Sequence, residues 1–163
     1  MKTLFLLRHA KSNRDAAGGN DFERTLALKG INDAKEAGKF LKTGKRFPEK
    51  IVCSPAARAR ETIEIVLESA GRKADLVFEN KIYSGNDSIL LDLIRNSADD
   101  KDSLMIVGHN PSIETLAGIL MQGHFPDEEY KTCGILALEF DVGKWKDIKE
   151  KSGKFIFYKS PAK

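Results

Sequence analysis

The chain has 163 residues, of which 41% are hydrophobic and 31% charged, and its formal net charge at pH 7 is +3. This length fits one domain, spanning residues 1–163, with a single core, and the composition is that of a globular protein. Because no apolar run approaches the roughly 20 residues that cross a bilayer, a membrane-spanning protein is excluded. Residues 1–3 lead directly into an apolar run, so we expect no signal peptide and a cytoplasmic location.

Positive charge gathers near the carboxyl terminus. Residues 144–163 hold seven lysines against Asp147 and Glu150, so the rest of the chain carries a small negative charge. A nucleic-acid surface needs arginines and lysines clustered with aromatic residues on the folded body. We therefore expect the lysine-rich segment to be a solvated surface, and we expect no nucleic-acid partner.

Apolar runs and helical repeats alternate along the first half of the chain. Residues 4–7 (Leu-Phe-Leu-Leu) predict a strand buried on both faces, and residues 10–25 predict a polar loop after it. A helix that ends near Gly44 follows the loop, with apolar positions at Leu28, Ile31, Ala34, Gly38 and Leu41.

A second strand and helix come next. Residues 51–53 predict the strand, while Ser54 and Pro55 predict the N-cap and first residue of the helix. The helix stops at Gly71, and its apolar positions are Ala59, Thr62, Ile63, Val66, Leu67 and Ala70.

The second half repeats this alternation and then becomes rich in strands. Strands are predicted over residues 76–78, 104–107, 135–140 and 155–158. Helical patterns cover residues 89–94 and 113–121, and the charged turn 99–102 is predicted to be solvated rather than metal-binding. The order of elements predicts an α/β fold: a three-layer sandwich with a mostly parallel central sheet flanked by helices.

Three of the predicted strands are followed by residues suited to binding phosphate. Arg8 and His9 follow the first strand, Arg58 lies in the segment after the second, and His109 follows strand 104–107. Since the carboxyl ends of parallel strands meet at one edge of a sheet, we expect these side chains to lie together. Helix amino termini expected at Ser54 and Asn110 add N–H groups that favour an anion.

This set permits phosphoryl transfer through a covalent histidine intermediate. The transition state is highly charged, so catalysis depends on positioning and on cations around the phosphoryl oxygens. One histidine must be neutral to attack, and neighbouring arginines help because like charge lowers its pKa. No metal is needed where arginines supply the positive charge.

Each residue also has an ordinary interpretation. Arg8 could pair with a surface carboxylate, and His9 and His109 could serve their loops alone. Arg58 could form a helical surface pair with Glu61 or Glu64. The occurrence of such residues at three corresponding strand ends favours a shared site over these separate explanations.

A metal site is the other chemical alternative. Zinc bound by His9 and His109 lacks an obvious third ligand, because His124 falls in a loop beyond the next helix. Cys53 and Cys133 have no metal or redox spacing, and Cys53 ends an apolar run as a small buried residue would. We expect no metal and no cofactor.

Three motifs resemble those of the histidine phosphatase superfamily, also called the phosphoglycerate mutase-like family. They are residues 8–12 (Arg-His-Ala-Lys-Ser), residues 54–59 (Ser-Pro-Ala-Ala-Arg-Ala) with Thr62, and residues 108–111 (Gly-His-Asn-Pro). The chain length, Asp21, Arg24 and Gly30 are similar to its SixA-type branch of phosphohistidine phosphatases. The match covers residues 4 to about 120, and residues 132–134 resemble that branch too.

The resemblance implies a phosphoglycerate mutase-like fold and a role for each motif residue. His9 would be the nucleophile that becomes phosphorylated. Arg8, Arg58 and His109 would bind the phosphoryl group and stabilise its transition state, and Arg24 would reach the substrate.

The chain departs from the superfamily after the third strand, where mutases and many phosphomonoesterases place a glutamate as proton donor. That position falls near Ser84, and Glu79 and Asp87 are the nearest carboxylates. The departure argues against mutase activity and favours a phosphatase acting on protein phosphohistidine. A small-molecule phosphomonoesterase and a non-catalytic phosphate-binding module are the alternatives.

The partner expected from the sequence is a phosphorylated protein or a small phosphate ester, with no membrane partner. Only about 25 residues separate Phe78 from Leu104, which leaves little room for a lid that would enclose a metabolite. We therefore expect a shallow pocket that is open to a protein side chain.

Overall fold

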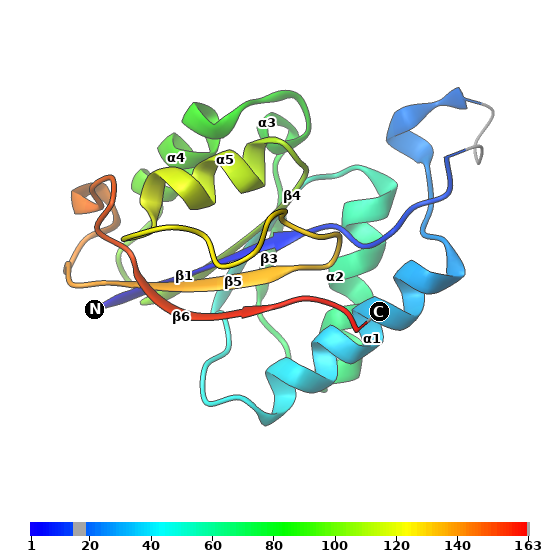
Figure 1. Ribbon diagram of the computed structural model, residues 1–163, viewed down its shortest axis with the longest axis horizontal. Helices are drawn as coiled ribbons and strands as arrows, with labels where there is room; N and C mark the ends of the chain where they lie inside the picture. Colours follow the sequence, from blue (N-terminus) through cyan, green and yellow to red (C-terminus); the bar gives the residue numbers. More distant parts are fainter. Residues whose placement is uncertain (15–18, 163) are drawn as a thin grey trace.

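A six-stranded sheet in the order β3-β2-β4-β1-β5-β6 forms the centre of the molecule (Figure 1). The computed structural model describes residues 1–14 and 19–162. The strands are β1 (Lys2–Arg8), β2 (Lys50–Cys53), β3 (Asp75–Phe78), β4 (Ser103–Gly108), β5 (Ile135–Phe140) and β6 (Lys154–Lys159).

The sheet is mostly parallel, as predicted. β1 pairs in parallel with β4, and β2 pairs in parallel with both β4 and β3. β5 is antiparallel to β1 and to β6, so among the described strands β5 alone runs against the others. β1 is therefore a central strand with neighbours on both sides, which is why its side chains at positions 4–7 are fully buried.

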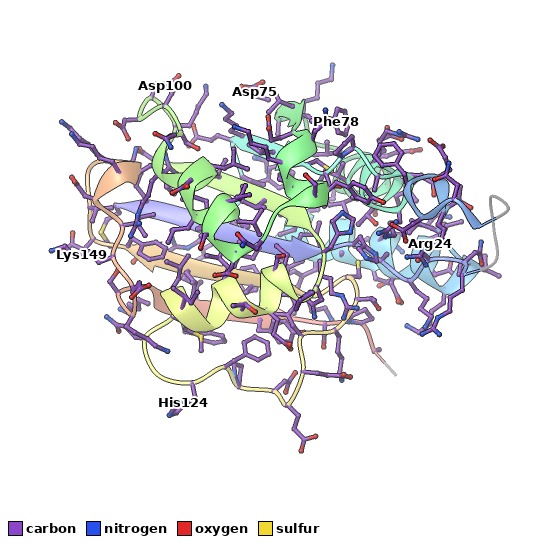
Figure 2. The ribbon with its side chains drawn as sticks, turned by 90° about the horizontal axis from the view of Figure 1, so that it is seen from above. Arg24, Asp75, Phe78, Asp100, His124 and Lys149 are labelled. Atoms are coloured by element: carbon purple, nitrogen blue, oxygen red, sulfur yellow. The ribbon has the colours of Figure 1, made fainter. Side chains whose placement is uncertain are left out.

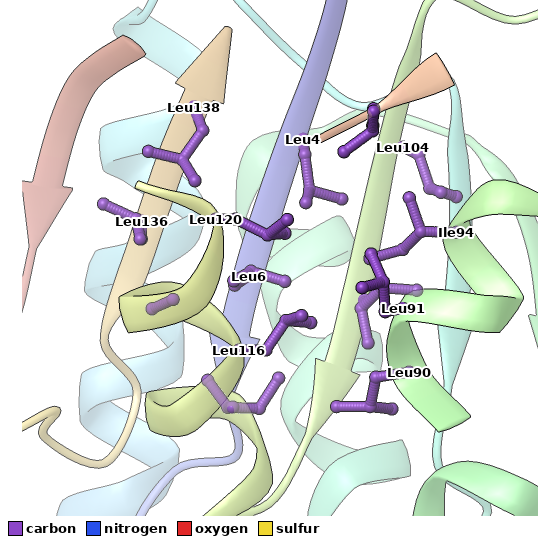
Figure 3. Packing of buried hydrophobic residues seen from close by; sticks show 14 of the residues in the cluster. Leu4, Leu6, Leu90, Leu91, Ile94, Leu104, Leu116, Leu120, Leu136 and Leu138 are labelled. Carbon is purple, nitrogen blue, oxygen red and sulfur yellow. The ribbon is translucent and has the colours of Figure 1, made fainter. Parts of the chain in front are cut away.

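Helices cover both faces of the sheet and give the predicted three layers (Figure 1). α1 (Leu28–Thr43) and α2 (Ala57–Ala70) pack together on one face, over a core that includes Phe5 and Leu7. α4 (Asp87–Arg95) and α5 (Ser112–Leu120) cover the other face, over Leu4 and Leu6 (Figure 3). Successive side chains of β1 thus point alternately into the two hydrophobic cores, one on each face of the sheet.

Most predicted boundaries hold, with two corrections. α2 ends at Gly71 in the left-handed conformation with φ 62°, as a helix-ending glycine predicts. It begins at Ala57 rather than at Pro55, because the Ser54 hydroxyl accepts the Ala56 N–H ahead of the helix. Leu28 was predicted to face the core but is 74% exposed.

Three short or edge elements differ from the expectation. The loop predicted over residues 10–25 contains a 3-10 helix, Asp21–Glu23, and its residues 15–18 lie outside the described part of the chain. α3 (Asn80–Ser84) was not predicted. β3 is an edge strand, which leaves Val77 and Phe78 exposed.

At the amino end of the sheet the fold buries a lysine. The Lys2 ammonium donates to the carbonyl oxygens of Asp99 and Lys101 and to the Asp102 carboxylate, at 2.9 to 3.0 Å. The 3-10 helix Trp145–Asp147 covers this end, where the Trp145 indole donates to the Lys101 carbonyl. The charged turn therefore supports Lys2, and no metal-holding cluster occurs among the residues described.

No helix in the described ranges is long and apolar enough to cross a membrane.

Candidate active site

The segment carrying Arg8 and His9 is held by backbone hydrogen bonds on both sides. The His9 N–H donates to the Gly108 carbonyl at 3.0 Å, which ties the end of β1 to the end of β4. The Cys133 N–H donates to both the Arg8 and His9 carbonyls at 3.0 Å. The parallel pairing predicted from the sequence therefore brings His9 and the segment of His109 to the same edge of the sheet.

His9 is oriented as a nucleophile by its own loop. Its Nδ1 lies 2.7 Å from the Ala10 carbonyl, which can only accept, so Nδ1 carries the proton and Nε2 keeps a free lone pair. Burial, with the positive charges of Arg58 and Arg8 nearby, lowers the pKa of His9 to about 3. At neutral pH the ring is therefore uncharged and able to attack.

His109 faces His9 across the site, with ring centroids 5.2 Å apart. Its Nε2 lies 2.8 Å from the Ser54 hydroxyl, which itself accepts the Ala56 N–H. The Ser54 hydroxyl can donate to His109 Nε2, and in that tautomer Nδ1 carries the proton on the other side of the ring. Burial, together with Arg58, lowers the pKa of His109 to about 4.

Arg8 and Arg58 each use some guanidinium nitrogens in hydrogen bonds to the protein, and the Nε of each has no protein partner. Arg8 Nη1 donates to the Tyr130 carbonyl at 2.7 Å, and burial lowers the pKa of Arg8. Arg58 donates from Nη1 to the Asp21 carbonyl at 2.8 Å and from Nη2 to the Asp21 carboxylate at 3.1 Å. Arg58 therefore does not form the ordinary pair with Glu61, whose carboxylate accepts the Leu26 N–H.

Three buried nitrogens of the candidate site residues lack a protein partner. They are Arg8 Nε, Arg58 Nε and His109 Nδ1, and within the described ranges they are the buried side-chain nitrogen and oxygen atoms that lack a hydrogen bond. An unpartnered buried donor costs about 1–3 kcal/mol, so a fold retains such groups where a ligand completes them. Two arginines and an imidazole N–H around a neutral histidine suit a phosphoryl oxyanion.

Asp21 and Tyr83 complete the site and were not predicted to act in it. The Asp21 carboxylate accepts hydrogen bonds from the Tyr83 hydroxyl at 2.8 Å, from Arg58, and from Arg24 at 3.0 Å. The Tyr83 bond, with help from both arginines, lowers the pKa of Asp21 to about 2. The predicted residue Arg24 thus joins the site through Asp21, beyond the end of β1 (Figure 2).

Of the two neighbouring residues Tyr83 and Ser84, Tyr83 faces the candidate site. Ser84 is exposed and its hydroxyl donates to the Asn80 carbonyl within α3. Tyr83 instead turns its ring toward His109, with ring centroids 5.7 Å apart. α3, a five-residue helix too short for a periodic sequence signal, buries Ile82 and leaves Tyr83 beside His109.

The residues considered from the sequence as metal ligands, His124, Cys53 and Cys133, form no metal-holding group in the described part of the chain. His124 is exposed on the loop after α5, on the side opposite β3 in Figure 2. Cys53 and Cys133 are both buried, and burial raises the pKa of the Cys133 thiol to about 12. Neither thiol is a ready metal ligand or nucleophile.

The fold and the donor set define a phosphate-handling enzyme, and comparison with known proteins gives its family. The model of the histidine phosphatase superfamily (branch 1) matches residues 4–81. A protein of Mycobacterium tuberculosis without an assigned function is 31% identical over 150 residues, covering 87% of this chain and 91% of the relative. The chain belongs to the histidine phosphatase superfamily.

Two solved structures have the same fold. The SixA protein of Agrobacterium tumefaciens, assigned as a phosphohistidine phosphatase, superposes with a TM-score of 0.81 at 26% identity over 98% of both chains. A protein histidine phosphatase SixA complexed with tungstate gives a TM-score of 0.81 at 22% identity, covering 97% of this chain and 96% of that one. The protein is accordingly a phosphatase with a phosphoglycerate mutase-like fold.

Proposed function

We propose that this phosphatase hydrolyses phosphohistidine on a protein substrate through a phosphorylated His9, without a metal ion. The observation that carries the proposal is the set of unpartnered buried nitrogens, Arg8 Nε, Arg58 Nε and His109 Nδ1, on residues that neighbour His9. The likeness to a SixA protein assigned as a phosphohistidine phosphatase supports the same substrate class.

The first step transfers the phosphoryl group from the substrate to His9. His9 Nε2 attacks phosphorus, the bond to the substrate nitrogen breaks, and the electron pair of that bond stays on the departing ring. The Nδ1–H of His9 stays hydrogen-bonded to the Ala10 carbonyl, and this bond stabilises the positive charge that the phosphorylated ring gains. Arg8, Arg58 and His109 stabilise the equatorial oxygens as charge shifts across them.

The second step releases phosphate. Water attacks phosphorus, the bond to Nε2 breaks with its electron pair returning to His9, and the proton lost by water leaves with phosphate or solvent. His9 becomes neutral again, the form that its lowered pKa of about 3 favours at neutral pH. The cycle closes without a metal because the arginines supply the positive charge that a metal ion would otherwise provide.

Phosphohistidine suits this site because the attacking and departing groups are alike. A phosphohistidine ring protonated on its other nitrogen departs as a neutral imidazole, so the first step moves positive charge from one ring to another. An alkyl alcohol departs poorly without a proton donor, which typically contributes 10²–10⁴-fold. Asp21, with a pKa of about 2, is ionised at neutral pH and is no such donor.

A protein substrate is favoured by the surroundings of Arg8. A cavity of about 920 Å³ adjoins the site there, far larger than a phosphoryl group needs. It is lined by charged side chains of both signs, among them Lys11, Lys131 and Glu129. Such a cavity offers hydrogen-bond partners to the polypeptide on either side of a phosphorylated histidine.

The test is phosphate release from a substrate panel with and without a chelator. We expect a phosphohistidine peptide to give a higher kcat/KM than a sugar phosphate. We also expect full activity after exhaustive chelation, and inhibition by vanadate and tungstate, which resemble the transferred phosphoryl group. Faster hydrolysis of sugar phosphates would point to a small-molecule phosphomonoesterase. Turnover of none of the panel would point to a phosphate-binding module.

A further inference from the structure

Tyr83 forms one wall of the site. Its ring meets His109 edge-on at 5.7 Å between centroids and lies 6.0 Å from the Arg58 guanidinium carbon. Phe22 packs edge-on against the other part of the ring at 5.0 Å and fixes its orientation. Tyr83 therefore borders both His109 and Arg58, and its hydroxyl lies at the exposed edge of the site, within a hydrogen bond to Asp21.

The direction of the Tyr83 hydrogen bond is set by Asp21. A carboxylate has about four acceptor positions, and Asp21 uses them for Arg24 Nε and Nη2, Arg58 Nη2 and the Tyr83 hydroxyl. The bond to Asp21 also raises the pKa of Tyr83, so the phenol keeps its proton. That single proton points at Asp21, which leaves the phenol oxygen as an acceptor only.

Building on the proposed function, we infer that the Tyr83 oxygen accepts a hydrogen bond from the N–H of the departing imidazole and thereby selects phosphohistidine over phosphate esters. When the phosphorus–nitrogen bond breaks, its electron pair stays on one ring nitrogen while the other keeps its proton. That proton requires an acceptor, and Tyr83 provides one. An alkoxide leaving group requires a donor, and Tyr83 has no proton to give it.

Asp21 is a positioning residue in this scheme. It touches neither substrate nor phosphorus, but it accepts the Tyr83 hydroxyl proton and so sets the direction of that hydrogen bond. It also accepts hydrogen bonds from Nη1 and Nη2 of Arg58, while Arg58 Nε stays without a protein partner. Replacing the carboxylate with an amide permits the reverse bond, because an amide N–H can donate to the phenol oxygen. The Tyr83 proton would then be free to meet an oxygen leaving group.

The experiment compares kcat/KM for a phosphohistidine peptide, a sugar phosphate and 4-nitrophenyl phosphate in wild type, Tyr83→Phe and Ser84→Ala. Loss of a hydrogen bond to a partly charged N–H predicts that the ratio of phosphohistidine to 4-nitrophenyl phosphate turnover falls about tenfold in Tyr83→Phe. Ser84→Ala is the matched control in the same helix, and there the ratio should not change. Equal losses on both substrates in Tyr83→Phe would overturn the inference.

Asp21→Asn tests the polarity of the bond. Loosening Arg58 should slow every substrate, so the informative quantity is again a ratio. We expect the ratio of sugar phosphate to phosphohistidine turnover to rise in Asp21→Asn, and an unchanged ratio would contradict the inference. Failure of the proposed function is seen separately, because wild type itself would then leave the phosphohistidine peptide intact.

Discussion

The two ends of the central sheet both bury cations but satisfy them differently. At the amino end, Lys2 is 1% exposed and its three donors all reach oxygen acceptors. At the carboxyl end, Arg8 and Arg58 each keep a buried Nε without a protein partner. A buried charge is costly unless it is paired, so the first arrangement is complete within the fold. The second is complete only with an anion, and this difference separates a structural cation from a functional one.

The largest effect should come from removing the nucleophile. His9→Ala should lower turnover by on the order of 10⁴-fold or more, because no covalent intermediate can form. The fold should remain, since the His9 side chain makes its one hydrogen bond within its own loop. Wild type denatured in alkali during turnover of a phosphorus-labelled substrate should carry label on His9. Near-normal activity of the variant would rule out the covalent route.

Replacing a site cation should separate activity from stability. Arg8→Met should lower kcat/KM by about 10²–10³-fold, the usual loss for one donor to a transition-state oxyanion. Its melting temperature should stay level or rise, because an incompletely paired buried charge is removed. The Tyr130 carbonyl keeps a second donor, Asn110 Nδ2 at 3.3 Å. A marked fall in melting temperature would show that Arg8 is a structural cation like Lys2.

The same replacement at the other end should have the opposite outcome. Lys2→Met removes a donor from three oxygens, of which the Lys101 carbonyl keeps the Trp145 indole, and should cost about 1–3 kcal/mol of unfolding free energy. Activity should be unaffected, because Lys2 is at the far end of the sheet. Lys149→Met, which removes an exposed lysine near the same end (Figure 2), is the matched control. Equal urea midpoints for the two variants would contradict the structural role of Lys2.

A further expected effect is a pH dependence of stability. Folding lowers the pKa values of His9 and His109 from 6.5 to about 3 and about 4. Below pH 6.5 the two histidines bind protons in the unfolded chain but stay neutral in the folded chain. Their contribution to the free energy of unfolding is therefore complete above pH 6.5 and decreases progressively below it. Urea midpoints should therefore fall between pH 7.5 and 5, and less steeply in His9→Ala. Imidazole ¹⁵N shifts that report a charged His9 at pH 5 would refute this account.

Much of the fold could be predicted because the buried elements have strong patterns. Residues 4–7 and 104–107 are apolar throughout, as central strands covered on both faces must be. The single-turn elements, α3 and the 3-10 helix Asp21–Glu23, are too short for a periodic pattern and were missed. The start of α2 was misplaced because a tertiary contact with His109 determines the role of Ser54.

The same reasoning explains which parts of the candidate site were predicted. Arg8, His9 and His109 follow strands that lie side by side, so topology alone brings them to one edge. Asp21 and Tyr83 are 62 residues apart and meet only because two loops fold over that edge. No spacing in the sequence encodes such a contact, so the part that Tyr83 plays beside His109 was not predicted.

The pairing of β1 also has a consequence for biosynthesis. Among the described strands, the one that ends at Arg8 pairs with β4 and β5, and the loop of Cys133 and Gly134 holds its end by hydrogen bonds. At about 5–20 residues per second, a ribosome needs on the order of ten seconds to proceed from β1 to β4, the first of its partners to be made. During that time the apolar β1 segment has no partner strand to cover it. We therefore expect the nascent chain to be a chaperone client, with catalytic competence among the last properties it acquires.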